Sequence, residues 1–328
     1  MPDQPANVHY CASVIDEAWP ATATALAAAG LPRPDRAAVA VPPPGREPGT
    51  WAGAPSAVCH GGDIYLAYRL RRPIGEGRGY AVAVARSADG VSFETILTIG
   101  KDEMGTESLE RPALVLTPDG TWRLYLSCAT TGTKHWRVEL IEASDPAGFD
   151  ARNRQVVLPG DEKSAVKDPV VVHHGGQWHL WASVHPLNDP AHTDRMTTDY
   201  ATSPDGVDWT WHGTALAPRP GEWDARGVRV SAVRLNSESV LAYYDGRATA
   251  AGNYEERTGL AAGRDPAALQ AVSAAGVAGS LKGRGLRYLD IVDLGDGRER
   301  WYYEVTRADG AHELVTEMRS AGWLAPGR

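Results

Sequence analysis

An internal repeat constrains the fold of this sequence more than any other feature. Five segments share one form, in which a small or charged residue precedes an apolar run, a turn with Gly, Asp or Asn, and an aromatic-rich strand. They read GAPSAVCHGGDIYLAYRL, ERPALVLTPDGTWRLYLS, KDPVVVHHGGQWHLWAS, RVSAVRLNSESVLAYYDG and RYLDIVDLGDGRERWYYEV. Their first strands begin near Ala54, Arg111, Asp168, Val230 and Tyr288, which gives spacings of 57, 57, 62 and 58 residues. This period fits a four-stranded propeller blade with generous loops.

Within each segment apolar residues alternate with period 2, and the turns have hairpin chemistry. Turns such as ARSADGVSFE and ATSPDGVDWTW then lead into an outermost strand. The sequence therefore predicts an all-β, five-bladed β-propeller over residues 51–320. A short N-terminal helical and linker extension over 1–50 and a tail over 321–328 complete the predicted organisation.

The N-terminal extension has three parts. Residues Ile15–Ala29 are Ala-rich enough for a short helix, although Pro20 must lie in its first turn or divide it. The Pro-rich stretch Val41–Gly49 is predicted to be a stiff linker. Because a propeller closes when one terminus completes the sheet begun by the other, we expect Ala37–Val41 to pair near Glu313–Met318.

Composition excludes several classes of function. A net charge of −8 opposes binding to nucleic acid, which requires a basic face. The three cysteines, Cys11, Cys59 and Cys128, have neither disulfide-framework nor zinc spacing. No signal-like or membrane-spanning stretch is evident, so we expect a cytoplasmic protein without a membrane partner. The 11 Trp and 12 Tyr against 2 Phe suit half-wet surfaces such as sugar-binding clefts, or rim packing between blades.

Functional side chains are expected where the first strands converge on the central axis. Charged residues at the starts of apolar strands are unfavourable unless they form ion pairs or take part in binding or catalysis. They therefore mark either a functional site or a ring of structural ion pairs. The candidates from the first strands are Glu110, Arg111, Lys167, Asp168, Arg229, Arg287 and Tyr288. Further candidates are Trp51 before the first strand and Asp245, Arg247, Glu255 and Glu256 in the fourth repeat, with Trp136 or His135 as possible stacking partners for a sugar.

The repeats, the D-P or E-x-P starts of the inner strands and the S-x-DG turns resemble the five-bladed glycoside hydrolases of the arabinanase, β-xylosidase and invertase clan. The likeness extends over about residues 51–318. It implies a general acid Glu, a general base Asp and a second Asp that orients or tunes the acid. Glu110 matches the E-x-P element and Asp168-Pro169 the D-P element, whereas the first-blade position is Ala54-Pro55 and lacks the carboxylate.

Three functions are compatible with this pattern. The first is a glycosidase acting on a small carbohydrate, with Glu110 and Asp168 as catalytic residues. The second is an inverting phosphorylase, whose phosphate nucleophile needs no base and could be held by Arg111, Lys167, Arg229, Arg247 and Arg287. The segment VLAYYDGRATAAGNYEERTGLAAGRD also resembles a stretch of the five-bladed mannoside phosphorylases. The third is a propeller that binds a sugar or an anionic sugar derivative without hydrolysing it.

No cofactor or catalytic metal is expected. His173 and His179 could share one face, but no Asp or Cys lies at ligand spacing, and a structural cation on the axis remains open. Nucleotide-binding and serine-hydrolase motifs are absent in the required strand-to-helix context. The oligomeric state is left open.

Overall fold

The computed structural model describes residues 30–280 and 284–321, which form β-strands and short 3₁₀ turns. The 3₁₀ turns are η1 (Pro34–Arg36), η2 (Ile74–Glu76), η3 (Pro146–Gly148), η4 (Ala151–Asn153) and η5 (Ala250–Gly252). The helix predicted over 15–29 and the tail beyond residue 321 lie outside the described residues. The described part of the chain is all-β, as the alternating pattern predicts.

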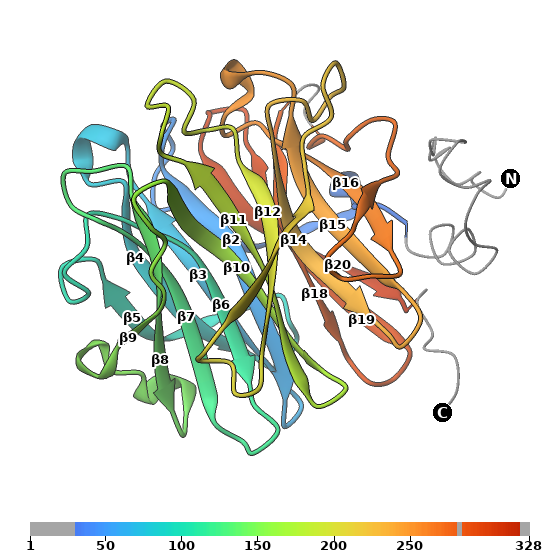
Figure 1. Ribbon diagram of the computed structural model, residues 1–328. Coiled ribbons are helices and arrows are strands. Elements are labelled where there is room, and N and C mark those ends of the chain that lie inside the picture. Colours follow the sequence, from blue (N-terminus) through green and yellow to red (C-terminus); the bar gives the residue numbers. More distant parts are fainter. Residues whose placement is uncertain (1–29, 281–283, 322–328) are drawn as a thin grey trace, which may run out of the picture.

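Each repeat forms a group of consecutive antiparallel strands (Figure 1). The first repeat contains β2 (Trp51–His60), β3 (Asp63–Arg71), β4 (Gly79–Ser87) and β5 (Glu94–Gly100). The second contains β6 (Leu109–Leu116), β7 (Trp122–Ala129), β8 (Trp136–Ala143) and β9 (Gln155–Leu158). The third contains β10 (Ser164–His174), β11 (Gln177–Pro186), β12 (Thr197–Ser203) and β13 (Thr210–Leu216). The fourth contains β14 (Gly227–Leu235), β15 (Val240–Arg247), β16 (Arg257–Gly263) and β17 (Gln270–Ala271).

The fifth repeat is completed by the N-terminal region. Its own strands are β18 (Leu286–Asp293), β19 (Arg298–Thr306) and β20 (His312–Ser320), and β1 (Ala38–Val41) pairs with β20. The register places Ala38 opposite Thr316 and Val39 opposite Val315, so the predicted pairing of the two chain ends is confirmed. A single parallel pair, Trp51 with His312, joins β2 to β20 and links the first and fifth repeats.

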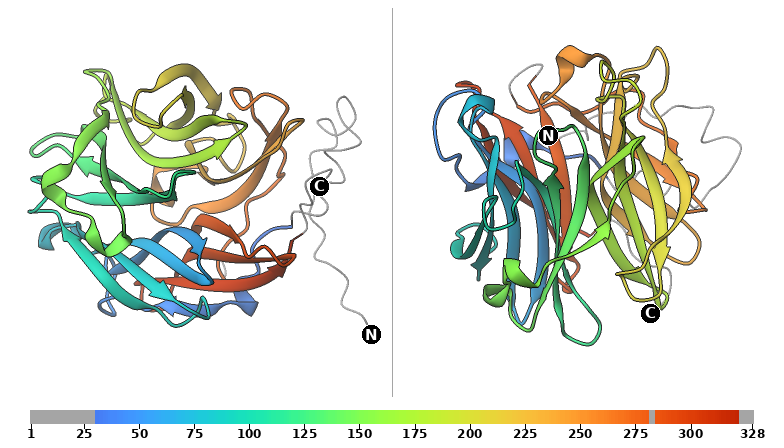
Figure 2. Two further views of the ribbon diagram at one scale, coloured as in Figure 1. Left: turned by 90° about the horizontal axis from the view of Figure 1, so that it is seen from below. Right: turned by 60° about the vertical axis from the view of Figure 1, so that its left-hand side comes forward.

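The core lies between neighbouring sheets. Large clusters of buried apolar side chains fill the spaces between successive repeats, and another cluster joins the first repeat to the fifth through Leu66, Tyr302 and Leu314. The first strands β2, β6, β10, β14 and β18 contact one another in this order, and β18 contacts β2. The sheets accordingly stand around a common centre (Figure 2), an arrangement compatible with a propeller.

The S-x-DG turns have the predicted local chemistry. In the first repeat, the Ser87 hydroxyl accepts a hydrogen bond from the Gly90 amide at 2.8 Å. The Asp89 carboxylate accepts from the amides of Val91 and Ser92, each at 2.8 Å. The Tyr302 hydroxyl of the fifth repeat donates to the Gly90 carbonyl at 2.9 Å, so the turn also fastens two sheets together.

Every first strand contains a register shift near its start. The shifts lie between Gly53 and Ser56, Leu109 and Pro112, Lys167 and Val170, Val230 and Ala232, and Arg287 and Asp290. Ala54, Asp168 and Tyr288 have φ of 53°, 54° and 55° at these shifts, a left-handed conformation that non-glycine residues seldom adopt. When the first strands are aligned at these register shifts, the residue equivalent to Ala54, Asp168 and Tyr288 in the second repeat is Glu110 and not Arg111.

Candidate functional site

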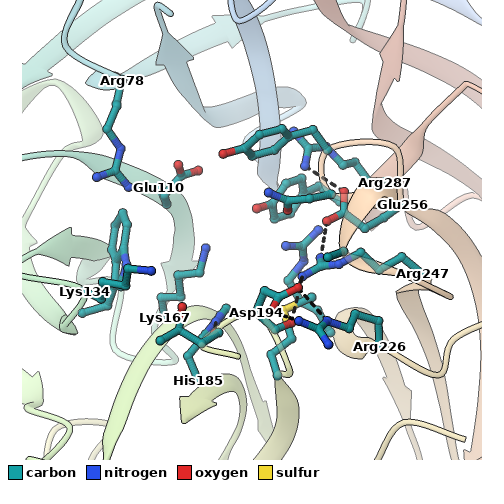
Figure 3. A pocket seen from close by; sticks show the side chains of 18 of the residues that line it. Arg78, Glu110, Lys134, Lys167, His185, Asp194, Arg226, Arg247, Glu256 and Arg287 are labelled. Carbon is teal, nitrogen blue, oxygen red and sulfur yellow. Dashed lines mark hydrogen bonds and ion pairs between the residues drawn. The ribbon is translucent and has the colours of Figure 1, made fainter. Parts of the chain in front are cut away.

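A pocket of about 500 Å³ lies at one end of the central axis, and we call it the central pocket. Figure 3 shows charged side chains pointing into it from opposite sides. Its described lining contains nine lysines and arginines but only three aspartates and glutamates, in a chain of net charge −8. The basic residues are Arg69, Arg71, Arg78, Lys134, Lys167, Arg226, Arg229, Arg247 and Arg287, and the acidic ones are Glu110, Asp194 and Glu256. The positive charge is thus concentrated in this pocket.

The second strands supply charges as well as the first strands. Arg69, Asp245 and Glu304 pair directly across the sheet with Gly53, Arg229 and Arg287. The three charged side chains are buried, with exposed fractions of 1%, 0% and 0%. Each lies near the end of its second strand, directly after apolar and aromatic residues of that strand, and close to the central axis. The strand geometry therefore gathers buried charges of both signs at the central pocket, with Arg69 in its lining and Asp245 and Glu304 beneath it.

One side of the central pocket, here called the paired wall, is a chain of alternating ion pairs formed by Arg226, Asp194, Arg247, Glu256 and Arg287. Arg226 Nη2 lies 2.7 Å from Asp194 Oδ1. Glu256 is held between Arg247, at 2.7 Å, and Arg287, at 2.9 Å. These arginines outweigh the effect of burial and lower the pKa of Glu256 to about 2. The dashed lines in Figure 3 mark these pairs, which fix the side chains in place.

The opposite side, here called the cationic wall, is formed by Arg78, Lys134 and Lys167 around Trp136. Lys167 Nζ lies 5.0 Å and Arg78 Cζ 5.7 Å from the centre of the Trp136 ring. Their ion pairs are long, at 3.3 Å from Arg78 to Glu107 and 3.5 Å from Lys167 to Asp168. Lys134 donates to the Pro190 carbonyl at 3.2 Å. This wall therefore presents positive charge that is less fully neutralised than that of the paired wall.

Glu110 is the acidic residue nearest the cationic wall in Figure 3. Its carboxylate forms ion pairs with Arg69 and with Arg71, the latter at 3.0 Å. Burial raises the pKa of Glu110, but Arg69, Arg71 and Lys167 together lower it well below its usual range. Glu110 is therefore ionised beside these cations, whereas a proton donor must carry a proton before it reacts.

Asp168 and Asp245 lie beneath the pocket and do not line it. Both are fully buried, and Arg229 Nη2 lies 2.9 Å from Asp245 Oδ2 while its Nη1 lies 3.4 Å from Asp168 Oδ2. Asp168 Oδ2 also lies 3.5 Å from the Tyr288 hydroxyl, and Asp168 Oδ1 is without a hydrogen-bond partner among the described residues. Burial raises the pKa of Asp168, but Lys167 and Arg229 lower it further and the net shift is downward.

His185 offers the central pocket a neutral acceptor. Its Nδ1 lies 2.8 Å from the Thr193 carbonyl, which can only accept, so Nδ1 carries the proton. Burial and Lys167 lower the pKa of His185 to about 3. The remaining nitrogen, Nε2, is buried without a partner among the described residues and belongs to a pocket-lining side chain. This nitrogen suits a sugar hydroxyl, which can donate to it.

The structure separates the predicted site residues into groups. Eight of them line the central pocket, namely Trp51, Glu110, Lys167, Arg229, Arg247, Glu256, Arg287 and Tyr288. Asp168 and Asp245 lie below it, and Glu255 lines a neighbouring pocket. Arg111 lines a different pocket together with Asp290, because it follows Glu110 in β6 and consecutive side chains of a strand point in opposite directions. Its expected place in the phosphate-binding cluster is therefore corrected.

Several residues that line the central pocket are not predicted by the repeat pattern of the sequence. Arg69 and Arg71 end the second strand of the first repeat, and Asp194 and Arg226 lie in loops. A sequence signal for the first two exists: two arginines in the R-L-R ending of an otherwise apolar strand, DIYLAYRLR. The loop residues carry no such signal, because isolated charges in loops are usually solvated.

We predict that Gly53→Ala disrupts this site. A Cβ at Gly53 would overlap the Glu304 carboxylate, which pairs with Arg69 and Arg287 at 2.7 Å each. Displacing a buried carboxylate from its partners is expected to lower the free energy of unfolding by about 3–5 kcal/mol. Chemical denaturation measures the change, with Gly75→Ala, where a Cβ meets nothing within 4 Å and φ is not positive, as a control for the glycine substitution itself. Equal stability of the two variants would contradict the prediction.

The described residues contain no group of three or more His, Cys, Asp or Glu side chains arranged to hold a metal ion. His179 Nδ1 instead lies 2.6 Å from the Tyr200 hydroxyl, and His173 packs against Trp178. No helix in the described ranges is long and apolar enough to cross a bilayer.

Comparison with protein-family models and with curated proteins finds no match. Solved structures do match. A glycosyl hydrolase from Bacteroides ovatus aligns over 81% of this chain and 83% of its own, with 15% identity and a TM-score of 0.58. A thermostable family-43 glycoside hydrolase aligns over 84% and 93%, with 13% identity and a TM-score of 0.63. A β-1,2-mannobiose phosphorylase from Listeria innocua aligns over 82% and 89%, with 16% identity and a TM-score of 0.58. In its fold, the chain is therefore similar to the propeller glycoside hydrolase clan that the repeats indicate.

Proposed function

We propose that this chain is a glycoside-active enzyme that cleaves a small glycoside with phosphate as the nucleophile. The observation that carries the proposal is the charge of the central pocket, where nine basic side chains face three acidic ones. Phosphate is recognised in proteins by arginine and lysine through charge-assisted hydrogen bonds. The cationic wall of Arg78, Lys134 and Lys167 is the proposed phosphate site, and the sugar lies between it and the paired wall.

The absence of a carboxylate at Ala54 favours phosphate over water. Ala54 is fully buried, and the acidic residues that line the pocket, Glu110, Asp194 and Glu256, are all paired with arginines. Water needs a base to remove its proton as it attacks, whereas phosphate attacks as an anion. A phosphorylase thus requires only a proton donor and a cluster of cations.

Glu110 is the proposed proton donor. Burial raises its pKa, but Arg69, Arg71 and Lys167 lower it further, so the net shift is downward. A phosphate dianion bound at Lys167 would oppose these cations and raise that pKa. In the reaction the bond from the anomeric carbon to the leaving oxygen breaks, and a bond to a phosphate oxygen forms. Glu110 gives its proton to the leaving oxygen and regains one from hydrogen phosphate.

Hydrolysis is the second candidate, because glycoside hydrolases are among the structures that share this fold. It requires Glu110 and Asp168 to act as acid and base, although both are ion-paired and Asp168 is fully buried. Sugar binding without turnover is the third candidate. The central pocket is compatible with both, but hydrolysis of a neutral glycoside does not account for the excess of positive charge in its lining, and of the binding functions only binding of an anionic sugar derivative does.

Five blades are part of the same proposal. The ring of contacts among the five first strands, and the apolar cluster between the first and fifth repeats, support it. In such a ring the starts of all the first strands meet, which accounts for the gathering of charges from repeats far apart in the sequence.

The proposal is tested by measuring turnover of a panel of disaccharides, β-1,2-mannobiose included, at increasing phosphate concentration. We expect release of the leaving sugar to rise with phosphate to saturation and to be negligible without it. Turnover that is independent of phosphate would establish hydrolysis instead. The absence of turnover, without any shift of the melting temperature by phosphate, would leave only the binding function.

A further inference from the structure

A second pocket, here called the axial pocket, has a volume of about 320 Å³ and is lined by residues from the first strands of all five repeats. It shares no lining residue with the central pocket. Most of its lining residues are apolar in type, among them Val58, Leu114, Val171, Val233 and Ile291, whereas polar and backbone groups supply more than half of the exposed lining surface. Two side chains of opposite charge, Arg111 and Asp290, lie among these residues.

Arg111 is the unusual member of the axial pocket. Its side chain is 2% exposed, and its Nη2 donates to the Ser231 carbonyl at 2.5 Å. Its Nε and Nη1 are buried and have no hydrogen-bond partner among the described residues. A buried guanidinium with two unused donors is unfavourable unless an acceptor completes it. The acceptor must enter through the pocket that this side chain lines.

Asp290 limits the charge of that acceptor. Its Oδ2 accepts a hydrogen bond from the Ala57 amide at 2.6 Å, and Asp293 lies in the same wall. Two carboxyl groups near one guanidinium would repel a phosphate or sulfate dianion. A single negative charge with a short apolar tail matches both the guanidinium and the Val, Leu and Ile side chains around it.

We propose that the axial pocket binds a short aliphatic carboxylate, with its carboxylate on Arg111 and its tail against the apolar side chains of the first strands. The site is separate from the central pocket and does not depend on the function proposed for that pocket. Its ligand class follows from the unpaired guanidinium and the apolar lining residues together.

Binding to the axial pocket is expected to depend on pH. Burial raises the pKa of Asp290 to about 6, against the opposing effect of Arg111. The other groups that act on Asp290 are the Ala57 amide from β2, the Ile291 amide from β18 and Tyr302 from β19, and Asp293 lines the same pocket. Asp168, Asp245 and Arg229 act on Arg111 from its other side, and the lining residues of β10 and β14 carry no charge. A protonated Asp290 removes the repulsion and can donate to the ligand. Affinity should therefore fall about tenfold per pH unit above pH 6, because the protonated fraction falls by that factor.

Cys59 provides a direct probe, because it is a partly exposed thiol in the wall of the axial pocket. In a Cys11→Ser background, we expect butyrate to slow the alkylation of Cys59, and neutral butyramide to have no effect. Protection should be stronger at pH 5.5 than at pH 7.5 after correction for thiolate content. Chloride protecting as well as butyrate would overturn the assignment to a carboxylate, and protection by neither anion would overturn the site.

Two variants complete the test. Arg111→Gln should abolish the protection by butyrate, whereas Arg86→Gln, on the exposed surface, should retain it. Asp290→Asn should keep the protection but remove its pH dependence. If Arg111→Gln does not fold, Asp290→Asn still decides the question, since an unchanged pH dependence in that variant contradicts the proposal.

Discussion

Glu110→Gln is expected to lower phosphate-dependent turnover by about 10²–10⁴-fold, because a glutamine cannot give a proton to the leaving oxygen and general acid catalysis contributes a factor of this size. The same change removes the negative charge held by Arg69 and Arg71. Breaking such a buried pair should also lower the free energy of unfolding by about 3–5 kcal/mol. Turnover is measured well below the melting temperature, on protein with a native circular dichroism spectrum.

The pH dependence of stability separates these two effects. The pKa of Glu110 in the folded protein lies below its unfolded value, so its ion pairs stabilise the fold above that unfolded value, near pH 4. This stabilisation disappears as pH falls through the folded pKa. The stability difference between wild type and Glu110→Gln should therefore be large at pH 7 and shrink toward pH 3. Glu142→Gln, whose carboxylate pairs with Arg123 at 40% exposure, serves as the control. A Glu110→Gln variant with normal turnover would exclude Glu110 as the proton donor.

Lys167→Met is expected to have the second-largest effect, raising the KM for phosphate and lowering kcat together by about a hundredfold. Lys167 is the one residue of the cationic wall whose cation lies both near Glu110 in Figure 3 and within 3.5 Å of Asp168. Loss of one preorganised charged donor typically lowers turnover by about 10²–10³-fold. Initial rates at varied phosphate and saturating sugar give both constants.

Two further variants control the lysine experiment. Lys167→Arg keeps the positive charge and should recover part of the activity, and Lys163→Met removes an exposed lysine outside the central pocket and should change nothing. An effect of Lys167→Met confined to the KM of the sugar would move the phosphate site away from the cationic wall.

Much of the fold follows from local sequence signals. The period of about 57 residues and the S-x-DG turns predict the groups of strands, and the Ala37–Val41 segment pairs with β20 as expected. These signals are strong because alternation and tight turns depend on residues near each other in the chain. The site was predicted less completely. Alignment of the first strands finds Glu110 and Lys167, but the charges of Arg69 and Glu304 come from second strands.

Arg111 illustrates the limit of alignment by pattern. A register shift of one residue decides which of two neighbouring side chains enters the central pocket and which enters the axial pocket. The letters E-R-P are compatible with either outcome. Only the pairing of Leu109 with Cys128 and of Pro112 with Leu126 fixes the direction of Glu110 and Arg111. Site residues near a bulge therefore require the structure.

The central claim is that phosphate, and not water, attacks the sugar in a pocket lined mainly by basic side chains. It is tested most directly by running the reaction in water enriched in oxygen-18 with unlabelled phosphate. The account predicts a sugar phosphate detectable by phosphorus NMR, with no heavy oxygen between its anomeric carbon and its phosphorus. Two free monosaccharides in place of the sugar phosphate, with the inorganic phosphate unconsumed, would contradict it.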